Sequence, residues 1–192
     1  MQTKMQTKTK TNGVDLIRLK ETVSAVKAVP ELGAFQFRIS NRWVEGGENQ
    51  SEVQTFTAGG REVPHSTDFV LYADEPDVLL GGDTGANPVE HLLHALASCV
   101  TTSMVYHAAA RGIPVEAVES TLEGELDLRG FLGLAPEVRK GYQGILMKLK
   151  IKASDLNDEQ LQELAALGPN FSPVYDSLCK GVTVAVTAER LE

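Results

Sequence analysis

The sequence predicts an α+β fold, with antiparallel strands and a few helices in a single domain. Residues 118–130 and 145–153 alternate apolar and charged side chains, as strands with one solvated face do. Residues 88–112 are instead apolar on nearly every face at helical spacing, which is typical of a long, buried helix. A chain of 192 residues can build one domain with a substantial core.

The first half of the chain is predicted to hold a tail, one helix and three strands. Residues 1–14 are polar, carry a duplicated MQTK and are expected to form a flexible tail. Residues 15–33 are expected to form a satellite helix that Pro30 stops, at the start of a single domain over residues 15–192. The predicted strands are residues 34–47, 51–60 and 66–76, and a glycine-rich turn joins the first two.

The second half is organised around the long helix. Asn87 suits its N-cap, Pro88 its first turn and Gly112 its C-terminal stop. The two alternating strands follow, one with acidic residues and one with lysines on the outer face, so their charges are expected to pair. The remaining predicted elements are a helix capped by Ser154 or Asn157, a short helix or turn over residues 172–181, and a last strand over residues 182–191.

Composition and charge exclude several classes of partner. The net charge of −8 argues against binding to nucleic acid or to an anionic membrane. No apolar run approaches the roughly 20 residues that span a bilayer, and the N-terminus lacks the apolar region of a secretory signal. We therefore expect a cytoplasmic protein, in which Cys99 and Cys179 form no structural disulfide, although a transient redox pair stays open.

Cys99 lies in the middle of the predicted long helix, and it has two interpretations. A free cysteine in a buried helix usually behaves as a small hydrophobic residue. A reactive thiolate would need a cation from another element, because the helix dipole acts within the first turn and Cys99 lies about three turns in. The candidates are Arg38, Arg42 and Arg61, which precede the helix.

The histidines of the long helix do not make a convincing metal site. His91 and His94 are three residues apart, but no cysteine or carboxylate cluster completes a tetrahedral set of ligands. No metal and no cofactor is expected.

The long helix carries a recognisable set of residues. They are Asn87-Pro88-Val89-Glu90, Leu92-Leu93, Ala95-Leu96-Ala97, Cys99 and the closing Ala110-Arg111-Gly112-Ile113. Together with SPVYDSLCKGVTVAV near the C-terminus, they resemble the OsmC/Ohr family, the osmotically inducible and organic hydroperoxide resistance proteins. The resemblance extends over residues 34–189, and the chain resembles a divergent member of this family.

The resemblance implies an OsmC-like fold, in which antiparallel sheets pack on two central helices in an intertwined homodimer. It also implies a thiol-dependent peroxidase that reduces small organic hydroperoxides. In that chemistry the first cysteine attacks the O–O bond and becomes a sulfenic acid, a second cysteine condenses with it, and an external thiol or dithiol restores the enzyme. An arginine favours the thiolate of the first cysteine, and a glutamate positions that arginine.

Three residues of this chain correspond to the family's catalytic positions. Cys99 matches the peroxidatic cysteine, and Arg61, in Gly59-Gly60-Arg61, resembles the arginine. Glu90 is close to the glutamate, since it lies nine rather than ten residues before the cysteine. In a straight helix Glu90 and Cys99 would lie about 180° and about 13 Å apart, so Glu90 is expected to act only through an arginine or the partner subunit.

The chain departs from the family at the second cysteine. The family has Cys-Pro-x-Ser, whereas here Ser172 precedes Pro173, so Ser172 stands at the position of the resolving cysteine. Cys179 comes seven residues later, about 10 Å further along a helix, and cannot simply replace it in a disulfide. Cys179 is either a second thiol that takes part after movement or a buried residue at a helix end.

Three functions stay open on the sequence alone. The first is a thiol-dependent peroxidase in which an external thiol resolves the oxidised Cys99. The second is a small-molecule-binding or stress-related protein that keeps the fold and has lost the two-cysteine chemistry. The third is a purely structural dimer, in which Cys99 would be unreactive.

Overall fold

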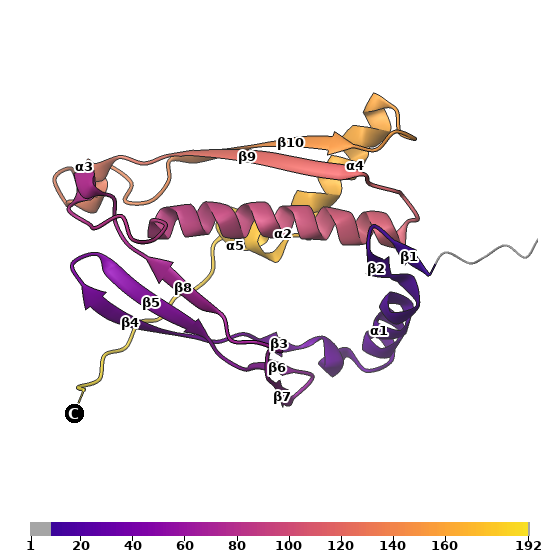
Figure 1. The fold of residues 1–192 in the computed structure, drawn as a ribbon, viewed down its shortest axis with the longest axis horizontal. Helices are drawn as coiled ribbons and strands as arrows, with labels where there is room; N and C mark the ends of the chain where they lie inside the picture. Colours follow the sequence, from indigo (N-terminus) through magenta and orange to yellow (C-terminus); the bar gives the residue numbers. More distant parts are fainter. Residues whose placement is uncertain (1–8, 192) are drawn as a thin grey trace, which may run out of the picture. The chain divides into compact units, whose positions relative to one another are not determined.

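The computed structural model describes residues 9–191 and has the predicted mixed α+β composition (Figure 1). The chain divides into two compact units, one up to His94 and one from Ala95, and each is described by itself below. All the strand pairs in the described part of the chain are antiparallel, as predicted. No helix within residues 9–191 is long and apolar enough to cross a membrane.

The first unit opens with a short hairpin that the sequence analysis missed. β1 (Lys10–Thr11) pairs with β2 (Val14–Asp15) around Asn12 and Gly13, which have φ angles of 52° and 79°. Asn-Gly with two positive φ angles is the preferred two-residue hairpin turn, so this part of the predicted tail is wrong. The duplicated MQTK at residues 1–8 lies outside the described residues.

The satellite helix is confirmed as α1 (Leu16–Ala28). The Asp15 side chain caps it by accepting hydrogen bonds from the backbone N–H groups of Ile17 and Arg18 at 3.0 and 3.1 Å. The α-helix ends before Pro30, and a 3₁₀ turn (η1, Pro30–Gly33) takes its place, because proline cannot continue the backbone ladder.

Six strands of the first unit form two three-stranded sheets. β3 (Phe35–Gln36), β6 (Phe56–Ala58) and β7 (Arg61–Val63) make one sheet, and β4 (Ile39–Glu45), β5 (Glu48–Val53) and β8 (Val70–Ala73) make the other. Each of the two long strands predicted before residue 60 is therefore divided between the sheets. Strand β7 was missed because it follows at once on the tight turn at Gly59 and Gly60, whose φ angles are 53° and 77°.

The loop before the long helix is organised by the buried carboxylate of Asp74. This side chain, 2% exposed, accepts hydrogen bonds from the N–H groups of Glu75, Gly82 and Thr84 and from the Thr84 hydroxyl. These donors, with the Thr84 N–H first, hold the pKa of Asp74 below its usual value, although the loss of solvation on burial opposes them. The loop, which contains η2 (Asp77–Leu79), thus has a fixed course up to the start of the helix.

The long helix is confirmed as α2 (Pro88–Ala110), which begins in the first unit and continues through the second. Gly112 follows it with a φ of 71°, as expected for a helix stop. The other elements of the second unit are β9 (Ala117–Glu125), α3 (Leu128–Phe131), β10 (Gly144–Lys152), α4 (Asp158–Phe171) and α5 (Pro173–Lys180).

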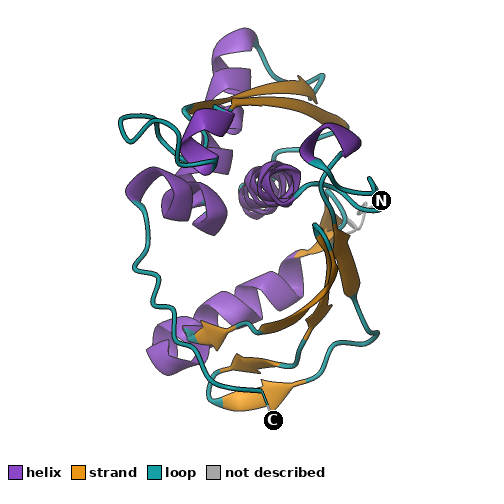
Figure 2. Cartoon of the chain, turned by 90° about the vertical axis from the view of Figure 1, so that its left-hand side faces the viewer, coloured by secondary structure: helices purple, strands orange, loops and turns teal. Residues whose placement is uncertain are grey.

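In the second unit, the β9–β10 pair and α4 pack on α2 (Figure 2). The core is formed by Met104, Ala108, Ala153 and Leu164. Gly168 lets α4 approach α2 closely, since an added Cβ would lie 2.7 Å from Cγ1 of Val100. The two strands lie side by side as predicted, and on the outer face Lys150 stands opposite Glu119, whereas Lys148 and Lys152 stand opposite Thr121 and Ala117.

The last predicted strand is absent from the described chain. Residues 181–191 follow α5 without helix or strand, and Val182, Val184 and Val186 are 65%, 76% and 89% exposed. The strand predicted over residues 182–191 is therefore wrong for the described chain: valine alternates with small residues there, but a strand also needs an edge to pair with, and no strand pair includes this segment within residues 9–191.

Candidate functional site

Cys99 lies on α2 at the edge of its most buried row. That row is formed by Leu96, Val100, Met104 and Ala108. Cys99 itself is a free thiol and only partly buried, so its side chain is not sealed in the core like its neighbour Val100, which is 2% exposed. This burial fits a thiol held on a rigid element better than it fits a small core residue.

A second row on α2 starts at Cys99 and continues at every fourth residue. Ser103 and His107 belong to this row, and Arg111 follows at the same spacing just after the helix ends at Ala110. All three contact Phe171, the last residue of α4. The Ser103 hydroxyl donates to the Phe171 carbonyl at 3.3 Å, and the His107 ring stacks on the Phe171 ring with a centroid distance of 3.6 Å. The Arg111 guanidinium carbon lies 5.8 Å from the same ring centroid.

Neither His107 nor Phe171 was among the residues singled out from the sequence. The four-residue spacing from Cys99 was visible and marked a ridge on one side of the helix. The partner, Phe171, lies 60 or more residues further along the chain, and no local pattern pointed to it.

Ser172 is buried at the start of α5, where it caps the helix. Its side chain is 2% exposed overall, and its hydroxyl accepts a hydrogen bond from the N–H of Tyr175 at 3.1 Å. Ser172 directly follows Phe171, whose carbonyl accepts a hydrogen bond from Ser103. Ser103 itself lies one helical turn after Cys99 on α2.

Cys179 lies near the C-terminal end of α5 and is exposed, so its interpretation as a buried residue at a helix end is wrong. An exposed position follows from the short amphipathic helix, which leaves one face to solvent. The hydrogen bond between Tyr175 and Cys179, with the charge of the thiolate, raises the pKa of the Tyr175 phenol. Since α5 is helical from Pro173, Cys179 is about two turns away from Ser172.

Glu90 is engaged at the N-terminus of α2. Its carboxylate accepts a hydrogen bond from the backbone N–H of Asn87 at 2.9 Å, while the Asn87 side chain accepts one from the N–H of Val89 at 2.9 Å. This is the reciprocal arrangement that stabilises helix starts, so Glu90 has a structural task beside any catalytic one. Glu90 lies in the first unit and Cys99 in the second, nine residues apart on the same helix.

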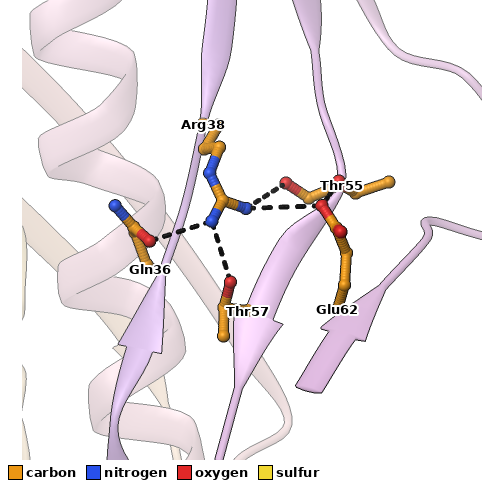
Figure 3. Close-up of polar contacts among 5 residues, drawn as sticks. All are labelled: Gln36, Arg38, Thr55, Thr57 and Glu62. Carbon is orange, nitrogen blue, oxygen red and sulfur yellow. Dashed lines mark hydrogen bonds and ion pairs between the residues drawn. The ribbon is translucent and has the colours of Figure 1, made fainter. Parts of the chain in front are cut away.

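Arg38, one of the three candidate cations, is held within its own sheet region (Figure 3). Its guanidinium donates to the Gln36 side chain and the Thr57 hydroxyl at 2.9 Å and to the Thr55 carbonyl at 3.4 Å. It also lies 3.7 Å from the Glu62 carboxylate. Three of the four partners lie on β3, β6 and β7, and Thr55 lies in the connection before β6, so this side chain links several strands.

The two other arginines, Arg42 and Arg61, differ in whether their side chains have hydrogen-bond partners. Arg42, on β4, donates to the Gln50 side chain on β5, the residue directly opposite. Arg61, at the start of β7, is exposed, and no hydrogen bond or ion pair joins its side chain to any residue within 9–191. Of the three, Arg61 has the side chain that is available to a ligand or a partner.

The second unit also contains an apolar cavity of about 500 Å³. It lies between α2, β10, α4 and α5, and its walls include Leu96, Val100, Met147 and Pro169. Gln162 and Tyr175 supply polar groups. An apolar space with a few polar groups is typical of small-molecule sites.

Comparisons with known proteins agree with this architecture. Residues 81–187 match the family model described as OsmC-like protein, a range that contains Glu90, Cys99, Ser172 and Cys179 but not Arg61. No curated protein matches the chain.

Solved structures of similar fold come from several bacteria. An OsmC-like protein from Mycoplasma pneumoniae is 15% identical, with 75% of this chain and 87% of that chain covered and a TM-score of 0.56. An OsmC-like protein of unknown function from Vibrio cholerae is 15% identical, with 74% and 92% covered and a TM-score of 0.52. At these identities the likeness establishes the fold, and the family model covers more than half of the sequence. The chain therefore belongs to the OsmC-like family.

Proposed function

We propose that this protein is a thiol-dependent peroxidase that reduces small organic hydroperoxides through Cys99. The observation that carries the proposal is the position of Cys99: a partly buried free thiol on α2, inside the matched region, next to the turn that contacts the Phe171–Ser172 corner. A rigid helix and a packed neighbouring corner would hold the sulfur and the attacked oxygen in a fixed geometry.

The proposed reaction has three balanced steps. The Cys99 thiolate attacks the O–O bond of ROOH, which takes up one proton and leaves as the alcohol ROH, while Cys99 becomes a sulfenic acid. A thiol R′SH condenses with the sulfenic acid, so that a mixed disulfide forms and water leaves. A second thiol then attacks the mixed disulfide, which releases R′SSR′ and returns Cys99 to the thiol.

An external thiol is the proposed resolving partner because of Ser172. A serine hydroxyl cannot form a disulfide, and Cys179 lies about two helical turns away at the other end of α5. The reducing cytoplasm would supply such a thiol or dithiol, which is why we propose that compartment for the protein.

Arg61 is the proposed cation for the Cys99 thiolate and the polarised peroxide. Arg38 and Arg42 are engaged with polar partners in their own sheets, whereas the Arg61 side chain is not. Glu90, whose carboxylate caps α2, is proposed to position this arginine or to act across the subunit interface. We further propose that the protein is a homodimer, because one chain leaves the valines of residues 182–186 exposed.

Turnover measurements test the proposal. Purified protein with a dithiol should consume an alkyl hydroperoxide catalytically, Cys99→Ser should abolish this activity, and Cys179→Ser should retain it. Consumption by Cys99→Ser at the wild-type rate would disprove the assignment of the site.

A small-molecule-binding protein without turnover is the second candidate. The apolar cavity of about 500 Å³ and the serine in place of the resolving cysteine favour it. Titration of free thiols after one equivalent of an alkyl hydroperoxide separates the two functions: the peroxidase loses one thiol, and the binding protein keeps both.

A further inference from the structure

Another cavity of the second unit combines apolar walls with two opposite charges that do not pair with each other. It has a volume of about 290 Å³ and lies between the turn that follows α2 and one face of α4. It shares no lining residue with the apolar cavity of about 500 Å³, so the two are separate spaces. Its volume corresponds to about ten water molecules, enough for one small organic molecule.

The apolar walls of this cavity belong to the edge of the core. Ile113, Leu156 and Leu167 are partly exposed and pack against the core, and Leu164 is 1% exposed. On α4 the lining residues are Gln160, Glu163, Leu164 and Leu167, at the spacing of residues that share one helix face. This face therefore presents polar groups on its first turn and aliphatic groups on the next.

Arg111 brings a guanidinium to the cavity that is only partly used. Its Nη1 donates to the His107 carbonyl at 2.9 Å and lies 3.2 Å from His107 Nδ1. Its Nε and Nη2 have no acceptor within residues 9–191. A guanidinium has five N–H donors, and the pair on Nε and Nη2 is one that binds a carboxylate with two parallel hydrogen bonds.

Glu163 brings a carboxylate, and Gln160 an amide, to the same cavity. Within the described part of the chain no hydrogen bond or ion pair engages the Glu163 carboxylate, so it does not close on Arg111 although both line one small space. The Gln160 side-chain oxygen accepts from the Asn157 N–H at 3.0 Å, which leaves the amide N–H groups as donors. The cavity thus offers donors for an anion, an acceptor for a cation and an aliphatic surface.

We propose that this cavity binds a free α-amino acid with an aliphatic side chain, such as leucine. The ligand carboxylate accepts from Arg111 and Gln160, its ammonium group donates to Glu163, and its side chain lies on the aliphatic wall. Each charge of the site rejects the wrong ligand: Glu163 disfavours a dicarboxylate and Arg111 disfavours a diamine. The site is independent of the chemistry proposed for Cys99.

Calorimetric titration of the reduced, full-length protein with four probes tests the three parts of the site. L-leucine carries all three groups, 4-methylpentanoate lacks the ammonium, 3-methylbutylamine lacks the carboxylate, and glycine lacks the side chain. Because the charged groups are exposed, we expect L-leucine to bind with a Kd of about 1 mM. Each of the other probes should bind at least about tenfold more weakly.

Two variants and one control place the ligand in this cavity. Glu163→Gln should weaken L-leucine about tenfold and leave 4-methylpentanoate unchanged, whereas Arg111→Gln should weaken both and leave 3-methylbutylamine unchanged. Glu159→Gln, exposed on the first turn of α4 and outside the cavity wall, should bind like the wild type. In NMR spectra L-leucine should shift the ring resonances of His107, which contacts Arg111, with the same Kd.

The probe series on the wild type decides the matter even if a variant fails to fold. No binding of L-leucine at about 20 mM would overturn the proposal. So would 4-methylpentanoate or 3-methylbutylamine that binds as tightly as L-leucine, because one of the two charges would then play no part. Unchanged L-leucine binding in both Glu163→Gln and Arg111→Gln would place the ligand elsewhere and overturn the proposal as well.

Discussion

At the scale of single residues, the account depends on which side chain brings positive charge to Cys99. Cys99 lies more than two turns inside α2, where the helix dipole gives no useful stabilisation of a thiolate. Arg38 is fixed by four partners and Arg42 by the residue opposite it, so both guanidinium groups are already engaged in hydrogen bonds or ion pairs near their own strands. The Arg61 side chain has no such partner within residues 9–191. Because Arg61 lies outside the region that matches the family model, its role as the cation is tested by mutation.

Arg61→Lys tests the geometry of this cation apart from its charge. Lysine keeps the charge and loses the planar fork, so we expect the rate of peroxide reduction to fall about tenfold, and about a hundredfold or more in Arg61→Ala. The measurement is the second-order rate of an alkyl hydroperoxide with the reduced protein. Arg42→Lys is the matched control and should react normally; a full rate in Arg61→Ala would transfer the role to Arg38 or Arg42.

Ser172→Cys tests the geometry of the resolving position. Ser172 follows Phe171, whose carbonyl accepts a hydrogen bond from Ser103, one turn after Cys99 on α2. If the family's geometry is kept, we expect the introduced thiol to form an internal disulfide with Cys99 after peroxide treatment without reductant. Mass spectrometry of intact and digested protein detects it. In the wild type we expect Cys99 sulfenic acid or its mixed disulfide. A rapid Cys99–Cys179 bridge in the wild type would instead establish a displaced two-cysteine mechanism.

At the scale of elements, the longer helices were predictable because their signals are local, whereas α3 (Leu128–Phe131) was missed and begins inside the range 118–130 that was predicted as a strand. Asp15, Asn87 and Asn157 each accept a hydrogen bond from the first turn of the helix they precede, and Pro30 follows the end of α1. Strands were predicted less well, since β7 has only three residues and the segment after Gly181 lacks a partner edge. Pairing between distant segments also explains why the contact of His107 with Phe171 was not foreseen.

The link between the start of β9 and the end of β10 gives a pH-dependent prediction. Hydrogen bonds from Lys152 first, and then from Ser154, lower the pKa of Glu116 from its usual 4.5 to about 2. The folded pKa is the lower one, so the stabilisation is present above pH 4.5 and is lost as the pH falls towards 2. Lys152 Nζ lies 2.8 Å from the carboxylate, and the pair is largely exposed, so the effect should be modest and sensitive to salt.

Urea denaturation at several pH values checks this link. The free energy of unfolding of Glu116→Gln should be lower than that of the wild type at neutral pH, and the difference should shrink as the pH falls below 4.5. Glu123→Gln, whose residue faces Leu146 across the strand pair, is the control. An equal difference at all pH values would mean that Glu116 does not act through its charge.

At the scale of the whole molecule, the exposed apolar surface of the described chain supports the proposal of a homodimer. Val182, Val184 and Val186 point to an unpaired strand, and further large apolar side chains such as Phe37 and Trp43 are 71% and 72% exposed. Isolated chains rarely present so much apolar surface unless it meets a partner. The family and the fold class were predictable from the motif on α2, whereas the assembly depends on surfaces that have no sequence signature of their own.

We expect a homodimer in sedimentation experiments at micromolar concentration. A chain that ends after Gly181 should dimerise more weakly, because it lacks the segment that can add a strand to a neighbouring sheet. Replacement of the three valines by threonine keeps strand propensity and should have a smaller effect than the truncation. A wild-type monomer at that concentration would contradict the proposed assembly.

The central claim is that Cys99 is the atom that reduces the peroxide, and trapping its sulfenic acid tests this most directly. The reduced protein is mixed with one equivalent of an alkyl hydroperoxide and dimedone, and the alcohol and the modified cysteine are quantified together. We predict about one alcohol and one dimedone adduct per chain on Cys99, in the wild type and in Cys179→Ser, and neither product in Cys99→Ser. Intact hydroperoxide with the wild type, or alcohol formed equally by Cys99→Ser, would contradict the account.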